Sequence, residues 1–424
     1  MNRRWWMLIV IVGVLAVIPS PAAAKDVGFD FYYQKVDEVV QINNPEPQGW
    51  WEKTKAFGKS VWNGAKRLWE ETVVRPYFPG EGAKTWYSKD DHDIAYRVTR
   101  VKVRSEAHLL ELMGAKGDES KLSDGQKALL ASYRAASSKA IKDRMALNQF
   151  RSTIVVHLTD TTGIDTSDPK YQSMREDFWP RSTGRTIQMA SFLYDYSGSE
   201  ADATSTMLHE FCHSLDNTFK EFRNPYGKDG SHFVNEKTGK RAAFVEGWAE
   251  FNEMLESKSE ANYVRNSIGW IRIESTSEEG KYKTLEAKDL TGLQLTEVEG
   301  INANIMYEMA TKLPDGRGKV FAAFQKSNYP WRNLRHLVRA LVKANPGDAA
   351  AVAGILDQAT LGKLSDKELL DFLGDSDVTR EAVAALRTVN ASAPAPAAET
   401  ADRVPLIDLT RPVIVGGGSN PFRE

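Results

Sequence analysis

The chain has 424 residues, and its 55 lysines and arginines nearly balance its 57 aspartates and glutamates. This balance excludes the broad basic surface that binding to nucleic acid requires, so we expect no nucleic-acid partner. The only cysteine, Cys212, excludes an internal disulfide, and a chain of this length can bury an ample core without one. We expect Cys212 to be a small buried side chain.

The first 24 residues predict an export signal. Arg3 and Arg4 precede an apolar run, and Ala22, Ala23 and Ala24 follow it as a small-residue cleavage site. This order is typical of a secretory signal peptide over residues 1–24, with a periplasmic or secreted product. An uncleaved membrane anchor is the alternative, but the apolar run is short for a span.

Residues 25–149 predict a separate, mainly helical N-terminal region. Its segment QGWWEKTKAFGKSVWNGAKRLWEETV carries apolar residues at helical spacing and lysines on the opposite face. Such a helix could lie on a membrane surface, but we favour packing on its own domain, because three tryptophans, Trp51, Trp62 and Trp69, are a large apolar area to expose. Further on, residues 93–105 alternate like a strand, and residues 122–150 have a helical pattern.

Two short strands are predicted at the start of a domain over residues 150–389. The runs RSTIVVHLTD and GRTIQMASFLY are rich in β-branched residues, with turn residues between them. His157 alternates with Val156 and Leu158, so we expect it to be structural.

The run HEFCH predicts a zinc-binding site. His209, Glu210 and His213 follow the pattern His-Glu-x-x-His inside a predicted helix, with an apolar stripe on one side. Residues four apart share a helix face, so both imidazoles can bind one zinc ion while Glu210 points to the space beside it. An ordinary helix with two surface histidines is the alternative.

A third ligand is available downstream, in AAFVEGWAEFNEM at residues 242–254. Glu246 and Glu250 are four apart and therefore share a helix face. The neighbouring positions are apolar, and carboxylates on a core-like helix need a partner, which a zinc site would supply. A solvated helix face is the alternative.

HEFCH followed by EGWAE resembles the gluzincin zinc metallopeptidases. The resemblance implies an α+β fold, with a zincin-like catalytic domain built from a small sheet, an active-site helix and a mainly helical lower half. It also implies one Zn²⁺ ion held by His209, His213 and Glu246. Glu250 would orient the His209 ring without binding the ion itself. The metzincin pattern needs Gly and a third His after the second histidine, and SLDNTF provides neither.

The resemblance implies peptide-bond hydrolysis of a protein or peptide substrate by a zinc-activated water, with Glu210 as the general base. His232 is our first choice for the oxyanion donor, and Tyr226, Tyr263 and Tyr307 are the other candidates. Residues 186–192 occupy the place of the edge strand that pairs with substrate in zincins. The Gly-x-Met-Glu-Asn run of the aminopeptidase N group is absent, which favours an endopeptidase. The rival hypothesis is a catalytically silent zincin-fold binding or scaffold protein of the cell envelope; the retained Glu210 favours the enzyme.

The remaining segments complete the predicted organisation. A helix is expected over 296–313, followed by the apolar runs VFAAFQKS and NLRHLVRALVKANPG, the latter ended by Asn-Pro-Gly. Glu297 and Glu299 could reach the site, but we favour solvated helix carboxylates. Residues 390–424 are predicted to be an Ala/Pro-rich linker and tail.

Overall fold

The structure, a computed structural model, describes residues 28–41, 81–87, 94–138, 141, 145, 153–164, 174–175, 177–183, 185–192, 200–215, 233–274, 282–327 and 333–392. The predicted signal peptide, the tryptophan-rich segment and the C-terminal tail beyond residue 392 lie outside these residues. Within the described ranges, no helix is both long enough and apolar enough to cross a membrane.

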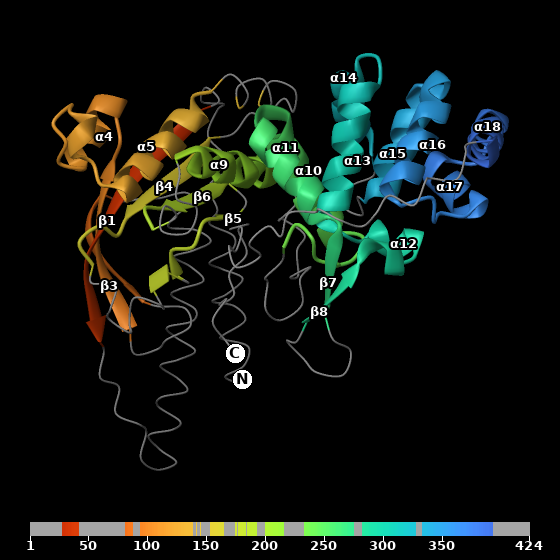
Figure 1. Cartoon of the computed structure of the whole chain (residues 1–424). Coiled ribbons are helices and arrows are strands. Elements are labelled where there is room, and N and C mark those ends of the chain that lie inside the picture. Colours follow the sequence, from red (N-terminus) through yellow and green to blue (C-terminus); the bar gives the residue numbers. More distant parts are fainter. Residues whose placement is uncertain are drawn as a thin grey trace, which may run out of the picture.

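A mixed six-stranded sheet forms one half of the molecule (Figure 1). Its strand order is β2-β3-β1-β4-β6-β5. The central strand β1 runs antiparallel to β3 and parallel to β4, β6 continues parallel to β4, and β5 closes the edge antiparallel to β6. The strands are β1 Phe29–Gln41, β2 Gly82–Tyr87, β3 Ile94–Lys102, β4 Ile154–Asp160, β5 Arg181–Thr183 and β6 Thr186–Ala190.

The prediction of a separate, mainly helical region over residues 25–149 is wrong for the residues described. They contain β1, β2 and β3 as well as the helices α4 (Glu106–Leu112) and α5 (Asp124–Ala136). Seven consecutive residues of β1 pair with β4, so no boundary near residue 150 divides the sheet. Pairing with β4 satisfies the backbone groups of β1, a contact that local periodicity cannot show. The strand and helix expected at 93–105 and 122–150 are confirmed as β3 and α5.

Two helices cover one face of the sheet. The helix α9 spans Glu200–Leu215 and lies beside α5 over that face (Figure 1). The sheet register places Phe31 beside Val156 and Tyr33 beside Leu158, and these side chains share a buried cluster with Met207 and other apolar residues of α9. The apolar stripe of α9 therefore packs on the sheet, and its opposite side is left for the histidines.

The second half of the molecule is mainly helical, with a two-stranded hairpin β7–β8 (Figure 1). Its elements are α10 Ala242–Glu256, α11 Lys258–Ser267, β7 Trp270–Glu274, β8 Tyr282–Glu286, α12 Gly292–Leu295, α13 Glu299–Lys312, α14 Gly316–Lys326, α15 Leu334–Ala344, α16 Ala349–Ala359, α17 Asp366–Leu373 and α18 Asp377–Ser392. The helix predicted over 296–313 and the two apolar runs after it are confirmed as α13, α14 and α15. The α+β class and the mainly helical second half are thus confirmed.

Helix α10 joins the two halves. Ala249 belongs to the apolar cluster under the sheet, whereas Phe244, Trp248 and Phe251 belong to the cluster of the helical half. The Trp248 ring stacks on Phe324 with ring centroids 3.8 Å apart. Because α10 is packed from both sides, the polar stripe that it turns toward α9 is held in place.

Candidate metal centre

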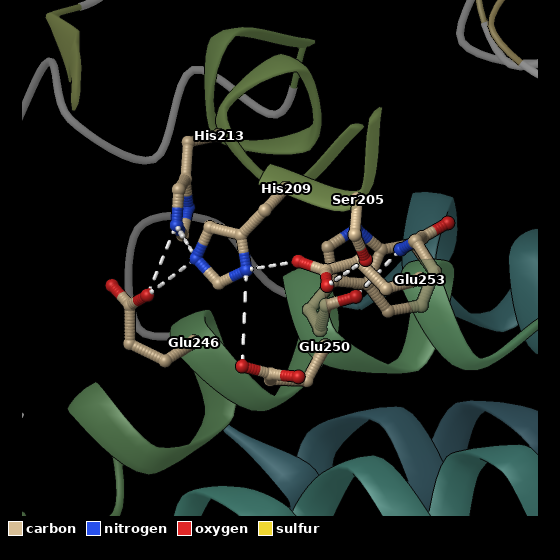
Figure 2. Close-up of polar contacts among 8 residues, drawn as sticks. Ser205, His209, His213, Glu246, Glu250 and Glu253 are labelled. Atoms are coloured by element: carbon tan, nitrogen blue, oxygen red, sulfur yellow. Dashed lines mark hydrogen bonds and ion pairs between the residues drawn. The ribbon is translucent and has the colours of Figure 1, made fainter. Parts of the chain in front are cut away.

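Two facing helices supply the side chains of the site (Figure 2). Ser205, His209 and His213 recur every four residues and so form one stripe on α9. A stripe of carboxylates on α10 faces them, and it consists of Glu246, Glu250 and Glu253. The contacts pair Ser205 with Glu253 and His213 with Glu246, so the two helices run in opposite directions.

The three predicted zinc ligands converge. His209 Nε2 lies 3.1 Å from Glu246 Oε2, His213 Nε2 lies 3.0 Å from the same oxygen, and the two Nε2 atoms are 3.0 Å apart. All three side chains are at most 2% exposed. Ligand atoms about 2.0–2.2 Å from a tetrahedral zinc ion would lie roughly 3.3 Å from one another, close to the spacing found here.

The hydrogen-bond chemistry of the triad fits a cation. His209 Nδ1 lies 2.6 Å from Glu253 Oε1, and a carboxylate can only accept there, so the Nδ1 proton is donated to it. Burial lowers the pKa of His209, which favours the neutral ring. Its Nε2 then directs a lone pair at Glu246 Oε2, another acceptor. Two facing acceptors in a buried site repel each other unless a proton or a metal cation lies between them.

The contact behind His209 differs from the prediction. Glu250 was expected to orient this ring, but its nearest carboxylate oxygen is 4.0 Å from Nδ1. Glu253, which the sequence analysis did not single out, makes the 2.6 Å contact instead. Glu253 Oε2 also accepts a hydrogen bond of 2.6 Å from Ser205 Oγ. The spacing of Glu253 from Glu246, seven residues on one helix, was the signal that could have identified it.

Glu210 is buried beside the triad. Burial raises its pKa well above the usual range, and the nearby charges of Glu246 and Glu253 raise it further. The backbone N–H of Ser182 donates a hydrogen bond to the Glu210 carboxylate, which opposes this rise. Its Oε1 has no hydrogen-bond partner among the described residues. One carboxylate oxygen is thus left for a proton or a small polar molecule.

The strand next to Glu210 is β5 rather than β6. Residues 186–192 were predicted to be the exposed edge, but β5 pairs with β6 along Thr186–Gln188 and takes the edge position. Ser182, at the centre of β5, also contacts Ser214 of α9, with 2.6 Å between the two hydroxyl oxygens. Three residues are too short a run for alternation to reveal a strand, so the sequence pattern pointed to its longer neighbour.

A further carboxylate, Glu299, lies in the same region. Glu299 was expected to be solvated, but it is fully buried at the start of α13, and its charge acts on Glu246 and Glu250. Glu297 forms an ion pair of 2.9 Å with Lys237 and is partly exposed, close to the prediction. Helix α13 packs closely against α10, which is why its first turn is buried.

The other predicted residues have separate surroundings. His232 and Tyr226 lie outside the described residues. The guanidinium of Arg265 lies over the Tyr307 ring, 4.8 Å from its centroid, and burial raises the pKa of Tyr263. Cys212 is buried in the apolar cluster under the sheet, as expected.

His157 contacts Gln34 through Nδ1 inside the sheet, in keeping with a structural role.

No family model matches this chain, and no curated protein and no solved structure is significantly similar to it.

Proposed function

We propose that the chain is an exported zinc metallopeptidase that hydrolyses peptide bonds within protein substrates. The observation that carries the proposal is the convergence of His209 Nε2, His213 Nε2 and Glu246 Oε2 within 3.0–3.1 Å of one another, beside Glu210. Three protein ligands leave one position of a tetrahedral ion open, as in catalytic rather than structural zinc sites. The predicted signal peptide at residues 1–24 supports export.

The zincin-like domain is part of this proposal. Bound zinc would polarise the scissile carbonyl and lower the pKa of a water molecule. Glu210 would accept a proton from the attacking water and deliver it to the leaving amine. Burial raises the pKa of Glu210, and this makes the carboxylate a stronger base toward the attacking water than an exposed glutamate would be.

Substrate would bind along the edge strand β5. Strand β5 is the last strand of the six-stranded sheet, so one of its sides faces away from β6. Ser182 at its centre contacts both Glu210 and Ser214. A peptide added there by main-chain hydrogen bonds would present its backbone beside the general base. The absence of the Gly-x-Met-Glu-Asn run favours cleavage within a chain over removal of the first residue.

The test is zinc content and hydrolysis of an unfolded protein such as casein, with a chelator and after zinc is restored. Glu210→Gln should retain zinc and lose nearly all hydrolysis, because it removes proton transfer without removing a ligand. Glu111→Gln, a change at an exposed glutamate of α4, is the matched control. Unchanged hydrolysis in Glu210→Gln, or in the zinc-free protein, would refute the proposal.

A catalytically silent binding or scaffold protein is the second candidate. It is favoured by the burial of the site, because Glu210 and all three candidate ligands are at most 2% exposed. Stoichiometric zinc without hydrolysis of any generic substrate by the parent protein would support this second candidate. The retained Glu210 and the open fourth position support the enzyme.

A further inference from the structure

We propose that Glu253, held by Ser205, is the positioning residue for the metal-binding histidine His209, and that Glu250 is not. The proposal rests on the proposed zinc site and departs from the pattern that the gluzincin resemblance implies. Figure 2 shows the three groups in line: the Ser205 hydroxyl, the Glu253 carboxylate and the His209 ring.

The distances separate the two carboxylates. His209 Nδ1 lies 2.6 Å from Glu253 Oε1 and 4.0 Å from Glu250 Oε1. The shorter distance is that of a charge-assisted hydrogen bond, whereas the longer one is too great for any hydrogen bond. Both Glu253 oxygens have a donor, since Oε2 accepts from Ser205. Glu250 Oε2 has no hydrogen-bond partner in the described part of the chain.

Helix geometry explains why the residue seven positions after Glu246 makes this contact. The two nitrogens of an imidazole point to opposite sides of the ring. Since Nε2 of His209 faces Glu246, the partner of Nδ1 must lie well along α10. A rise of 1.5 Å per residue places Glu253 roughly 10 Å along the helix axis from Glu246, and Glu250 only about 6 Å. Glu250 therefore lies beneath the ring, as Figure 2 shows, and Glu253 lies beyond it.

The Ser205 hydroxyl fixes the other end of the contact. Ser205 precedes His209 by one helical turn, so the donor that holds Glu253 and the ring that Glu253 orients belong to the same helix face. The hydrogen bond keeps the proton on Nδ1 and leaves the lone pair on Nε2, where the metal would bind. Removal of a carboxylate that orients a metal-binding histidine commonly weakens metal affinity by about 10- to 100-fold.

A second metal ion is the alternative for these groups. Ligand atoms of His209, Glu250 and Glu253 lie within 4.8 Å of one another and could surround an ion. However, the 2.6 Å between Nδ1 and Glu253 is shorter than the roughly 3.3 Å that separates two ligands of one ion, and it matches a hydrogen bond. The geometry thus favours the positioning role.

Two isosteric variants of the full chain, Glu253→Gln and Glu250→Gln, test the proposal, with zinc affinity measured by competition with a fluorescent chelator. We expect about 10- to 100-fold weaker zinc binding in Glu253→Gln and less than about 3-fold change in Glu250→Gln. Ser205→Ala should weaken binding to a smaller extent and should add little in the Glu253→Gln background, because both act through one hydrogen-bonded chain.

The tautomer of His209 gives a second measurement that does not need zinc. Nitrogen-15 NMR of the metal-free protein should show the Nδ1–H form in the parent and in Glu250→Gln, and its loss in Glu253→Leu, whose side chain has no acceptor for the Nδ1 proton. Equal zinc losses in the two variants, loss in Glu250→Gln alone, or two zinc ions per chain falling to one would overturn the proposal. If the parent binds no zinc but shows the Glu253-dependent tautomer, the proposed function fails and the contact with Glu253 stands.

Discussion

Replacement of Gly247 by alanine tests the packing that holds Glu246 in place. Gly247 follows Glu246 on α10 and lies close to the backbone of α13. An added Cβ would lie 2.7 Å from both Asn302 Cβ and the Glu299 carbonyl oxygen, and 3.1 Å from the Ala303 nitrogen. Two of these atoms belong to the backbone, so α13 must shift. Overpacking of this kind costs about 1–3 kcal/mol of unfolding free energy.

Helix propensity works in the opposite direction, and a second variant removes it from the comparison. Alanine is favoured over glycine inside a helix by about 1 kcal/mol. Gly354→Ala on α16 gains this helix-propensity free energy without a clash, because nothing lies within 4 Å of its added Cβ. The difference in unfolding free energy between the two variants should therefore be about 1–3 kcal/mol, the overpacking cost alone.

Urea unfolding measures this difference, and zinc titration measures its effect on the site. We expect Gly247→Ala to be the less stable variant and to bind zinc more weakly than the parent, because Glu246 moves with its helix. Gly354→Ala should bind zinc as the parent does. If Gly247→Ala were as stable as Gly354→Ala, the close approach of α10 and α13 would be refuted.

Two further predictions concern the metal-free protein. Zinc at 1,000 times its Kd stabilises a protein by about 4 kcal/mol, and the unfolding entropy of a chain of this length is roughly 0.85 kcal/mol per kelvin, so a chelator should lower the Tm by about 5 °C in calorimetry; an unchanged Tm would argue against a zinc site. Burial raises the pKa of Glu246 to about 7 from its ordinary 4.5, so the folded, zinc-free protein binds this proton more tightly than the unfolded chain. The contribution of Glu246 to stability should therefore be fully present below pH 4.5 and be lost as the pH rises through about 7. The difference in urea midpoint between the parent and Glu246→Gln should change over this range, and a difference independent of pH would contradict this.

Local sequence patterns identified the helices of the site and predicted that His209, His213 and Glu246 lie together. The spacing of His209 and His213 requires one helix face, and the apolar positions around Glu246 require a packed helix. Both requirements depend on residues within two turns, so they can be judged without the rest of the fold. The same holds for α13, α14 and α15, which have regular apolar spacing and clear ends.

The partner of His209 could not be predicted in this way. Glu250 and Glu253 lie on the same stripe of α10, and which of them meets Nδ1 depends on how α10 is rotated and shifted relative to α9. Packing against α9 on one side, where Ala249 enters the apolar cluster, and against α13 on the other sets that rotation. Residues far apart in the sequence determine the contact, so the short sequence motif pointed to the neighbouring carboxylate Glu250.

The position of β1 at the centre of the sheet affects how the protein can be shortened. A chain that began at residue 150, where the sequence suggested a boundary, would keep β4 but lose its neighbour. Every residue of β4 is buried, so Ile154–Asp160 would become a strand with its four apolar side chains less covered and with unpaired backbone groups along one side. Exposed strands of this kind pair with copies of themselves. Such a shortened chain should aggregate, and soluble protein for study of the metal site must begin upstream of Phe29.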